Sequence, residues 1–337
     1  MAISTPLIRS ASLSGYAELA RSLGLQPGAL MRRVGLDPRH LDDPETPIRV
    51  DAARQLLELS ALQAGVEDFG LRLAMNRRIA NLGPISIVLR EAPTARRALD
   101  TLSRYLRLLN ATLLTRIEDH ADLVIIREEL LVTSGQSVRQ SMELAVGVMF
   151  RILSELLGPQ WRARLVCFSH RAPQDTGSHR ALFDAPLEFN ASFNGIVCAA
   201  PDLAAALPTI DTGMAPFARR FLDQALSSAG ASTVDNTRAL IAALLPGGRC
   251  TADQVAQHLG IDRRTLYRHL AAEGHSFSAL MLSVRREFAQ RQIRDSDRSL
   301  AELADLLGFS SPSAFAFWFR RVFGTTVTAW KRAQRSA

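Results

Sequence analysis

The stretch TADQVAQHLGI at residues 251–261 is followed 48 residues later by SLAELADLLGF at residues 299–309, which has a similar pattern of polar, apolar and glycine positions. Each copy begins with a hydroxyl residue and carries Gln or Glu three positions on, which is the capping-box pattern of a helix start. Each ends at a glycine that can adopt the left-handed conformation, followed by an apolar residue. A second helix is expected after each glycine, with Asp262 and Ser311 as its N-caps. This repeated helix, turn and helix predicts two helix-turn-helix units.

The second helix of the first unit, expected over residues 263–272, has two distinct faces. At about 100° of rotation per residue, Leu266 and Leu270 point inward, while Arg264 and Arg268 lie opposite. Two arginines one turn apart suit the major groove of DNA, where Arg can bond guanine O6 and N7. A solvated arginine pair is the alternative, and the turn pattern in front of the helix favours DNA contact.

The second helix of the second unit shows the same division. Phe315, Phe319 and Val322 form its inward stripe, while Arg320 and Arg321 face outward. A long helix at about 276–294 is expected to join the two units, with apolar residues available for packing. If rigid, it would place both recognition helices on one face of the duplex, about 34–36 Å apart.

The charge distribution divides the chain into two parts. Residues 1–237 carry 25 Lys+Arg against 25 Asp+Glu, whereas residues 238–337 carry 15 against 8. The whole net charge of +7 therefore lies in the last hundred residues. A basic module behind a neutral one is typical of a nucleic-acid reader with a separate sensing or assembly domain. The alternatives are a solvated cationic surface or an arginine-rich composition, since Lys331 is the sole lysine.

The pattern in front of the basic module mixes helices and strands. Helices are expected at 48–64, 67–78, 94–109, 136–157, 213–228 and 233–245, and strands at 111–118, 122–132, 162–169, 187–190 and 194–199. The first two strands are expected to connect through Asp119-His120. This predicts an α+β N-terminal domain for sensing or dimerisation, followed by an all-α C-terminal domain with two helix-turn-helix units joined by a long helix.

The C-terminal residues resemble the DNA-binding domain of the AraC/XylS family of bacterial transcription regulators. The resemblance covers about 238–334 and rests on motifs such as Leu259-Gly260, Thr265-Leu266-Tyr267-Arg268, Leu307-Gly308-Phe309-Ser310, Phe319-Arg320-Arg321-Val322-Phe323-Gly324 and Trp330-Lys331. It implies base reading by Arg264, Tyr267, Arg268, Pro312, Ser313 and Phe317. We further expect DNA-backbone contacts from Arg263, Thr265, Ser311, Arg320 and Arg321. Two positions depart from the family pattern: Val327 replaces the usual proline, and Phe317 stands where a polar reader is common.

The front of the chain resembles the arabinose-binding-like N-terminal domain of one branch of this family. The resemblance rests on runs such as Gly83-Pro84, Tyr105-Leu106-Arg107-Leu108-Leu109 and Phe168-Ser169-His170. It implies a domain at 5–210 that senses an effector, self-associates or does both. Connecting helices then occupy 211–246, and the DNA-binding domain occupies 247–334, with helix-turn-helix units at about 252–272 and 300–323 around the linker helix.

No catalytic or metal-binding pattern is present in the sequence. GxSxG, HExxH, P-loop and dinucleotide motifs are absent, so we expect no enzyme activity, no cofactor and no metal. Cys167 and His170 at i and i+3 on a strand would point to opposite faces, which argues against a shared metal. Glu128 and Glu129 end a predicted strand, where we expect both to be solvated.

Three interpretations of function stay open. The first is a regulator, more an activator than a repressor, that is controlled by a small molecule bound to the N-terminal domain. The second is a non-sensing regulator whose front domain only dimerises or binds a protein, and the third is an enzyme fused to a DNA-binding tail. The expected partners are promoter DNA, an effector, a second copy of the chain and, for an activator, RNA polymerase. Three widely spaced cysteines, no signal-peptide pattern and no apolar run of membrane-spanning length favour the cytoplasm.

Overall fold

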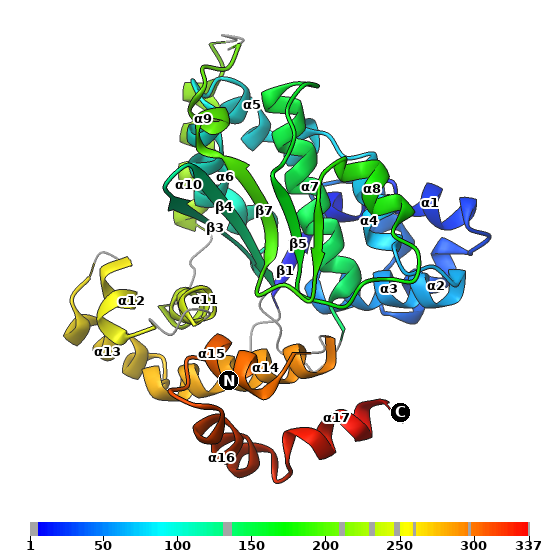
Figure 1. The fold of residues 1–337 in the computed structure, drawn as a ribbon. Helices are drawn as coiled ribbons and strands as arrows, with labels where there is room; N and C mark the ends of the chain where they lie inside the picture. The colour runs from blue at the N-terminus through cyan, green and yellow to red at the C-terminus, as the bar shows by residue number, and fades with distance from the viewer. Residues whose placement is uncertain are drawn as a thin grey trace. The chain divides into compact units, whose positions relative to one another are not determined.

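The computed structural model describes residues 6–130, 137–208, 213–228, 233–245, 250–258, 261–295 and 298–335. The chain divides into two compact units. The N-terminal unit comprises residues 1–130, 138–168 and 172–229, and the C-terminal unit comprises 131–137, 169–171 and 230–337. Mixed α/β structure in the first unit and helices in the second confirm the coarse fold class expected from the sequence (Figure 1).

A sheet in the order β3-β4-β7-β5-β6 forms the centre of the N-terminal unit. Its strands are β3 (Leu113–His120), β4 (Leu123–Leu130), β5 (Leu165–Phe168), β6 (Leu187–Phe189) and β7 (Asn194–Ala199), all close to their predicted positions. Neighbouring strands are antiparallel except β5 and β6. The β3–β4 turn was expected at Asp119-His120, which is wrong by two residues. His120 still pairs with Leu123, and the chain turns at Ala121-Asp122, where Ala121 has a φ of 50°.

Helices pack against this sheet, and β1 (Leu7–Arg9) and β2 (Pro47–Arg49) form a small second sheet (Figure 1). The helices of the N-terminal unit are α1 (Tyr16–Ser22), α2 (Pro27–Arg33), α3 (Val50–Ala64), α4 (Phe69–Met75), α5 (Pro84–Arg90), α6 (Ala95–Leu109), α7 (Arg139–Leu157), α8 (Gly177–Phe183), α9 (Ala200–Ala204) and α10 (Ala215–Ser228). Three short 3-10 helices, η1 (Ser10–Leu13), η2 (Pro38–Leu41) and η3 (Ile79–Leu82), connect them. Helix α6 packs against β3, while α7 packs against β4 and β7.

The described secondary-structure elements of the C-terminal unit are all helices. Its helices are α11 (Thr233–Leu244), α12 (Ala252–His258), α13 (Arg263–Ala272), α14 (Phe277–Asp295), α15 (Leu300–Leu306), α16 (Pro312–Phe323) and α17 (Val327–Arg335). Helix α12 packs on α13, and α15 packs on α16. The apolar residues expected on the long helix are buried in α14: Phe277, Leu280, Val284, Phe288 and Ala289. Within the described ranges, no helix is both long and apolar enough to cross a membrane.

The 48-residue repeat is visible in the backbone of the two helix pairs. The amide of Ile261 donates to the carbonyl of Ala256 at 3.0 Å, and the amide of Phe309 donates to that of Ala304 at 2.8 Å. Gly308 has the left-handed φ of 69° expected at the turn. Its counterpart Gly260, with Leu259, lies outside the described residues. Both expected capping boxes are present, in Thr251 with Gln254 and in Ser299 with Glu302.

Candidate functional site

Helix α13 presents a polar face that carries three of the predicted base readers, Arg264, Tyr267 and Arg268. Its start is capped by Asp262, whose carboxylate accepts from the amide of Thr265 at 2.8 Å. Leu266 and Leu270 are fully buried, which confirms the predicted inward stripe. The side chains of Arg263, Arg264, Tyr267 and Arg268 are exposed, and Thr265 is partly buried. The helix therefore exposes three guanidinium groups and one phenol along one side.

The arginines of α13 differ in what they contact. Arg263 forms an ion pair with Asp253 at 3.2 Å, and its guanidinium lies 5.5 Å from the centre of the Tyr267 ring. Contact with Tyr267, and then the Asp253 charge, raises the pKa of Arg263 above its ordinary value. For Arg264 and Arg268, no carboxylate of the described residues lies within 4.0 Å. Both can therefore bond an external acceptor without breaking an internal ion pair.

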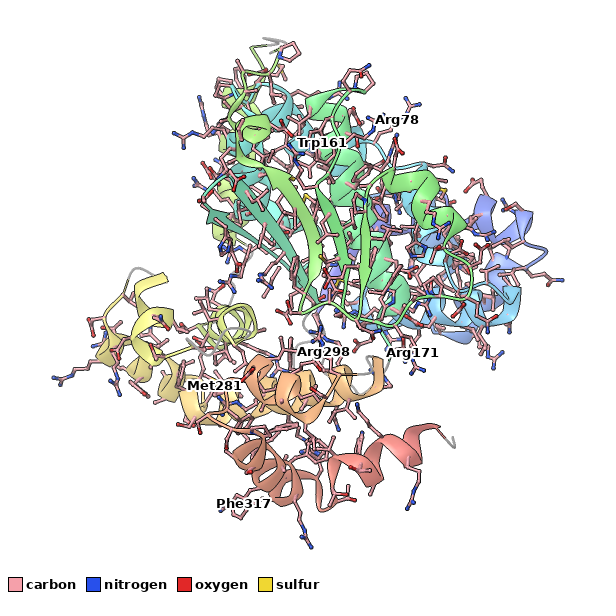
Figure 2. The ribbon with its side chains drawn as sticks, in the orientation of Figure 1. Arg78, Trp161, Arg171, Met281, Arg298 and Phe317 are labelled. Carbon is pink, nitrogen blue, oxygen red and sulfur yellow. The ribbon has the colours of Figure 1, made fainter. Side chains whose placement is uncertain are left out.

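Helix α16 presents a different outward face. Ser311 accepts from the amide of Ala314 at 3.1 Å, which confirms it as the N-cap. Phe317 is 72% exposed and points away from the helix, as Figure 2 shows. Pro312, Ser313, Arg320 and Arg321 are also exposed, with the two arginines in the last turn. Neither of these arginines has an ion pair with a described residue.

An aromatic cluster holds α16 in place from its other side. Phe315 and Phe319 are fully buried. The Phe319 ring lies 4.3 Å from the Phe323 ring and 6.1 Å from the Trp330 ring of α17, centre to centre. The Phe309 ring at the turn lies 5.5 Å from Phe315 and also carries the Arg285 guanidinium at 4.9 Å, which ties α14 to the turn. This aromatic packing fixes which side of α16 faces inward and which faces outward.

Val327, where the family pattern has proline, is buried and begins α17. The Thr326 hydroxyl accepts from the amide of Ala329 at 3.2 Å, so an ordinary side-chain cap starts this helix. Proline is favoured at a first helical position because its φ is already helical and its missing N–H is not needed there. Valine at this place keeps the helix start and adds a buried side chain.

The N-terminal unit contains a cavity of about 160 Å³. Apolar side chains from α3, α6 and α7 provide most of its wall, among them Leu57, Leu102, Leu106, Leu144 and Val148. Polar groups enter it from β1, η1, β4 and the segment after α4. An apolar space with few polar groups is the usual form of a small-molecule site.

Glu128 lies in the wall of this cavity, and its predicted solvation is wrong. It is only 2% exposed, because Val124, Ile126, Glu128 and Leu130 alternate on the covered face of β4. One carboxyl oxygen, Oε1, accepts from the Thr115 hydroxyl at 2.9 Å, and Oε2 has no partner among the described residues. Burial raises the pKa of Glu128 to about 8, so its carboxyl is largely protonated at neutral pH. The alternation in LVIIREEL could have revealed this position from the sequence alone.

Glu128→Gln is expected to remove a pH dependence from the stability of the N-terminal unit. The pKa of Glu128 is about 8 in the folded state, against about 4.3 in an unfolded chain. The folded state therefore holds the proton of Glu128 more tightly than the unfolded chain. The contribution of this proton to the free energy of unfolding is complete below about pH 4. It then falls by up to about 1.4 kcal/mol per pH unit until the pH passes the folded-state pKa.

Urea unfolding of the parent chain and of Glu128→Gln is measured between about pH 5 and 8. The free energy of unfolding of the parent chain should fall relative to that of Glu128→Gln as the pH rises, by up to about 1.4 kcal/mol per pH unit. Glu129→Gln, one residue on and partly exposed on the opposite face of β4, is the matched control and should keep the parent slope. Parallel pH profiles for the parent chain and Glu128→Gln would contradict a protonated Glu128.

Cys167, considered above as a metal ligand together with His170, is a buried core residue. Cys167 is 1% exposed, and burial raises the pKa of its thiol to about 12. A thiolate is the nucleophilic and metal-binding form, so this thiol is inert at neutral pH. Within the described ranges, no three His, Cys, Asp or Glu side chains cluster as a metal site.

Two arginine-bearing helix faces on a basic helical unit, which follows in sequence a unit with an apolar cavity, define a DNA-binding transcription regulator. Comparison with protein families agrees: the "Arabinose-binding domain of AraC transcription regulator, N-term" matches residues 24–207, and a helix-turn-helix domain matches residues 255–333. This chain belongs to the AraC family of transcription regulators.

Relatives that match nearly the whole chain occur in Mycobacterium tuberculosis and Pseudomonas aeruginosa. The HTH-type transcriptional regulator VirS of Mycobacterium tuberculosis is 30% identical over 322 residues, which cover 95% of each chain. The ornithine utilization regulator of Pseudomonas aeruginosa is 21% identical over 330 residues, or 97% of each chain. Among solved structures, the transcriptional regulator CdpR of Pseudomonas aeruginosa covers 93% of this chain and 97% of its own, at 18% identity and a TM-score of 0.44. Each of these relatives is named as a regulator.

Proposed function

We propose that this regulator binds promoter DNA through two helix-turn-helix units, α12–α13 and α15–α16, joined by α14, and that a small molecule in the N-terminal unit controls its binding. The observation that carries DNA reading is the pair Arg264 and Arg268, exposed opposite the buried Leu266 and Leu270. The observation that carries effector control is the apolar cavity with buried Glu128 in its wall. We expect the output to be activation.

The two helix-turn-helix units contribute differently to DNA recognition. Arg264, Arg268 and Tyr267 can discriminate bases by hydrogen bonds, so α13 dominates base reading. Ser313 and Phe317 are the readers proposed on α16, where Phe317 can touch a thymine methyl but cannot bond a guanine edge.

The remaining proposed contacts go to the DNA backbone. They are made by Arg263, Thr265, Ser311, Arg320 and Arg321. In the free protein, the Thr265 hydroxyl donates to the Asp262 cap at 2.9 Å, and the Ser311 hydroxyl itself caps α16. Both residues therefore lie at helix N-termini, where backbone amides favour a phosphate.

Arg268→Ala is expected to reduce affinity for the best promoter site by about 1–3 kcal/mol and to flatten base preference at one position. The reason is that a bidentate arginine–guanine contact specifies sequence, whereas a phosphate contact only positions the protein. Arg321→Ala is the control, since it makes the same substitution at an arginine of α16 that is proposed to contact a phosphate. It should weaken all sequences about equally and leave the preference profile unchanged.

A binding selection from a randomised DNA library measures both variants against the parent chain. A profile that Arg268→Ala leaves intact would overturn the proposed reading by α13.

The exposed Phe317 gives a sharper test of α16, because Phe317→Ala should remove at most a thymine preference in the second half-site. A lost guanine preference there would instead assign base reading to Ser313.

The proposed assembly is a homodimer formed by a domain at 5–210, connected through residues 211–246 to a DNA-binding domain at 247–334. A dimer doubles the DNA contacts, and an activator would also contact RNA polymerase. Sedimentation velocity over a range of concentrations tests the assembly, and a chain that stays monomeric at the highest concentration would refute it.

A further inference from the structure

The cavity of the N-terminal unit has room for a small ring or a short chain. Its volume of about 160 Å³ is close to that of an engineered apolar cavity of about 150 Å³ that binds benzene. Side chains such as Leu57, Leu102, Leu106 and Val148 give its occupant an apolar surface. The body of a fitting ligand is therefore apolar and of about the size of a six-membered ring.

Arg77 places a positive charge in the same wall, directly after α4. It is only 5% exposed, and its guanidinium donates to the backbone carbonyl of Ala11 at 2.8 Å and to that of Ser12. Among the described residues it has no carboxylate within ion-pair distance, and its Nε has no hydrogen-bond partner. Burial lowers the pKa of Arg77 to about 10, which still leaves it charged at neutral pH. Buried charges are ordinarily paired, so this one lacks its anion.

The other charged groups of the wall favour an anion over a cation. Arg9 pairs with Glu45, Arg54 lies 3.7 Å from Asp51, and Arg78 is exposed at the surface, where Figure 2 labels it. Glu128 is the acidic member of the wall, and its protonated form does not repel an anion. The unpaired Oε2 of Glu128 can instead donate a hydrogen bond to an oxygen atom of a ligand. A cationic ligand would enter among guanidinium groups and face no ionised carboxylate.

We propose that this cavity binds a small carboxylate with an apolar body, whose negative charge compensates Arg77 and whose polar edge faces Glu128. The proposal rests on the proposed effector control and names the chemical class of the effector. It involves no covalent step. The ligand supplies the two things the wall lacks, an anion for a buried cation and a partner for a buried carboxyl group.

Three probes of one shape test the charge preference: cyclohexanecarboxylate, cyclohexylammonium and cyclohexylmethanol, each titrated into the full chain without DNA. A ligand that binds only the native state raises the melting temperature in a saturable way. Cyclohexanecarboxylate is expected to do so and to bind at least ten times more tightly than the other two. Equal binding of all three, preference for cyclohexylammonium, or no binding of cyclohexanecarboxylate by calorimetry at millimolar concentration would overturn the proposal.

Variants then assign the contacts. Arg77→Gln should weaken cyclohexanecarboxylate at least tenfold, whereas Arg39→Gln, which removes a surface arginine 84% exposed, should change nothing. Glu128→Gln should keep binding of cyclohexanecarboxylate within a few fold, because an amide also donates a hydrogen bond. A cation could bind only by ionising Glu128, so this variant would abolish cation binding. Ala145→Phe fills the cavity from α7 and should abolish binding, which keeps the test decisive if Arg77→Gln fails to fold.

Failure of this proposal is distinguishable from failure of effector control. Affinity for promoter DNA is measured separately, with and without saturating cyclohexanecarboxylate. If the probe binds in the cavity and promoter affinity stays the same, the ligand site stands and the control of DNA binding is refuted.

Discussion

Phe319→Ala is expected to lower the free energy of unfolding of the C-terminal unit by about 3–5 kcal/mol. Phe319 is fully buried between Phe315, Phe323 and Trp330, at ring-centre distances of 5.8, 4.3 and 6.1 Å. Truncation removes the burial of the ring and leaves a cavity that the neighbouring rings can close only in part. Because this cluster fixes the orientation of α16, promoter binding should fall with stability.

Phe317→Ala is the matched control, since it removes the same atoms two residues away. Phe317 is 72% exposed, so its truncation should change stability by about 0.5 kcal/mol or less. Urea unfolding of the full chain, followed by circular dichroism and tryptophan fluorescence, measures both variants. Equal losses of stability from the two substitutions would show that the inward and outward faces of α16 are wrongly assigned.

Promoter affinity is expected to fall steeply with salt. Each phosphate neutralised by an arginine contributes about −0.9 to the slope of log affinity against log salt, because counterions are released from the DNA. Arg263, Arg320 and Arg321 are the arginines proposed at phosphates, so one chain should give a slope of about −2.7 and a dimer about twice that. Between 50 and 200 mM salt, these slopes correspond to losses of roughly 40-fold and roughly 10³-fold.

Titration of the full chain with a labelled promoter at several salt concentrations gives the slope directly. Arg321→Ala should reduce its magnitude by about 1 for each chain bound, and Arg39→Gln, in the charge-balanced first 237 residues, should leave it unchanged. An affinity that hardly varies with salt would exclude phosphate contact as the main source of binding, despite the net charge of +7 in the last hundred residues.

The C-terminal unit could be predicted closely from the sequence. Helix α13 begins and ends where the sequence predicted, Asp262 and Ser311 cap as expected, and Phe317 faces outward. These features depend on interactions between residues a few positions apart: caps bond amides three residues on, and helical rotation repeats every 3.6 residues. Which of the outward residues reads a base remains a prediction, because the contacts that decide it belong to a complex with DNA.

Glu128 shows what only the tertiary structure decided. Its position at the end of a predicted strand indicated a solvated carboxylate. In the structure, however, β4 pairs with β7, about seventy residues further along the chain, and α7 covers the face on which Glu128 lies, so Glu128 is buried. Arg77 likewise became a buried cation because η1, from the start of the chain, supplies the carbonyls that hold it. Sequence patterns set local conformation, because caps and helical faces are short-range. Burial, and with it the charge state and the cavity, is set by segments distant in sequence, which tertiary packing brings together.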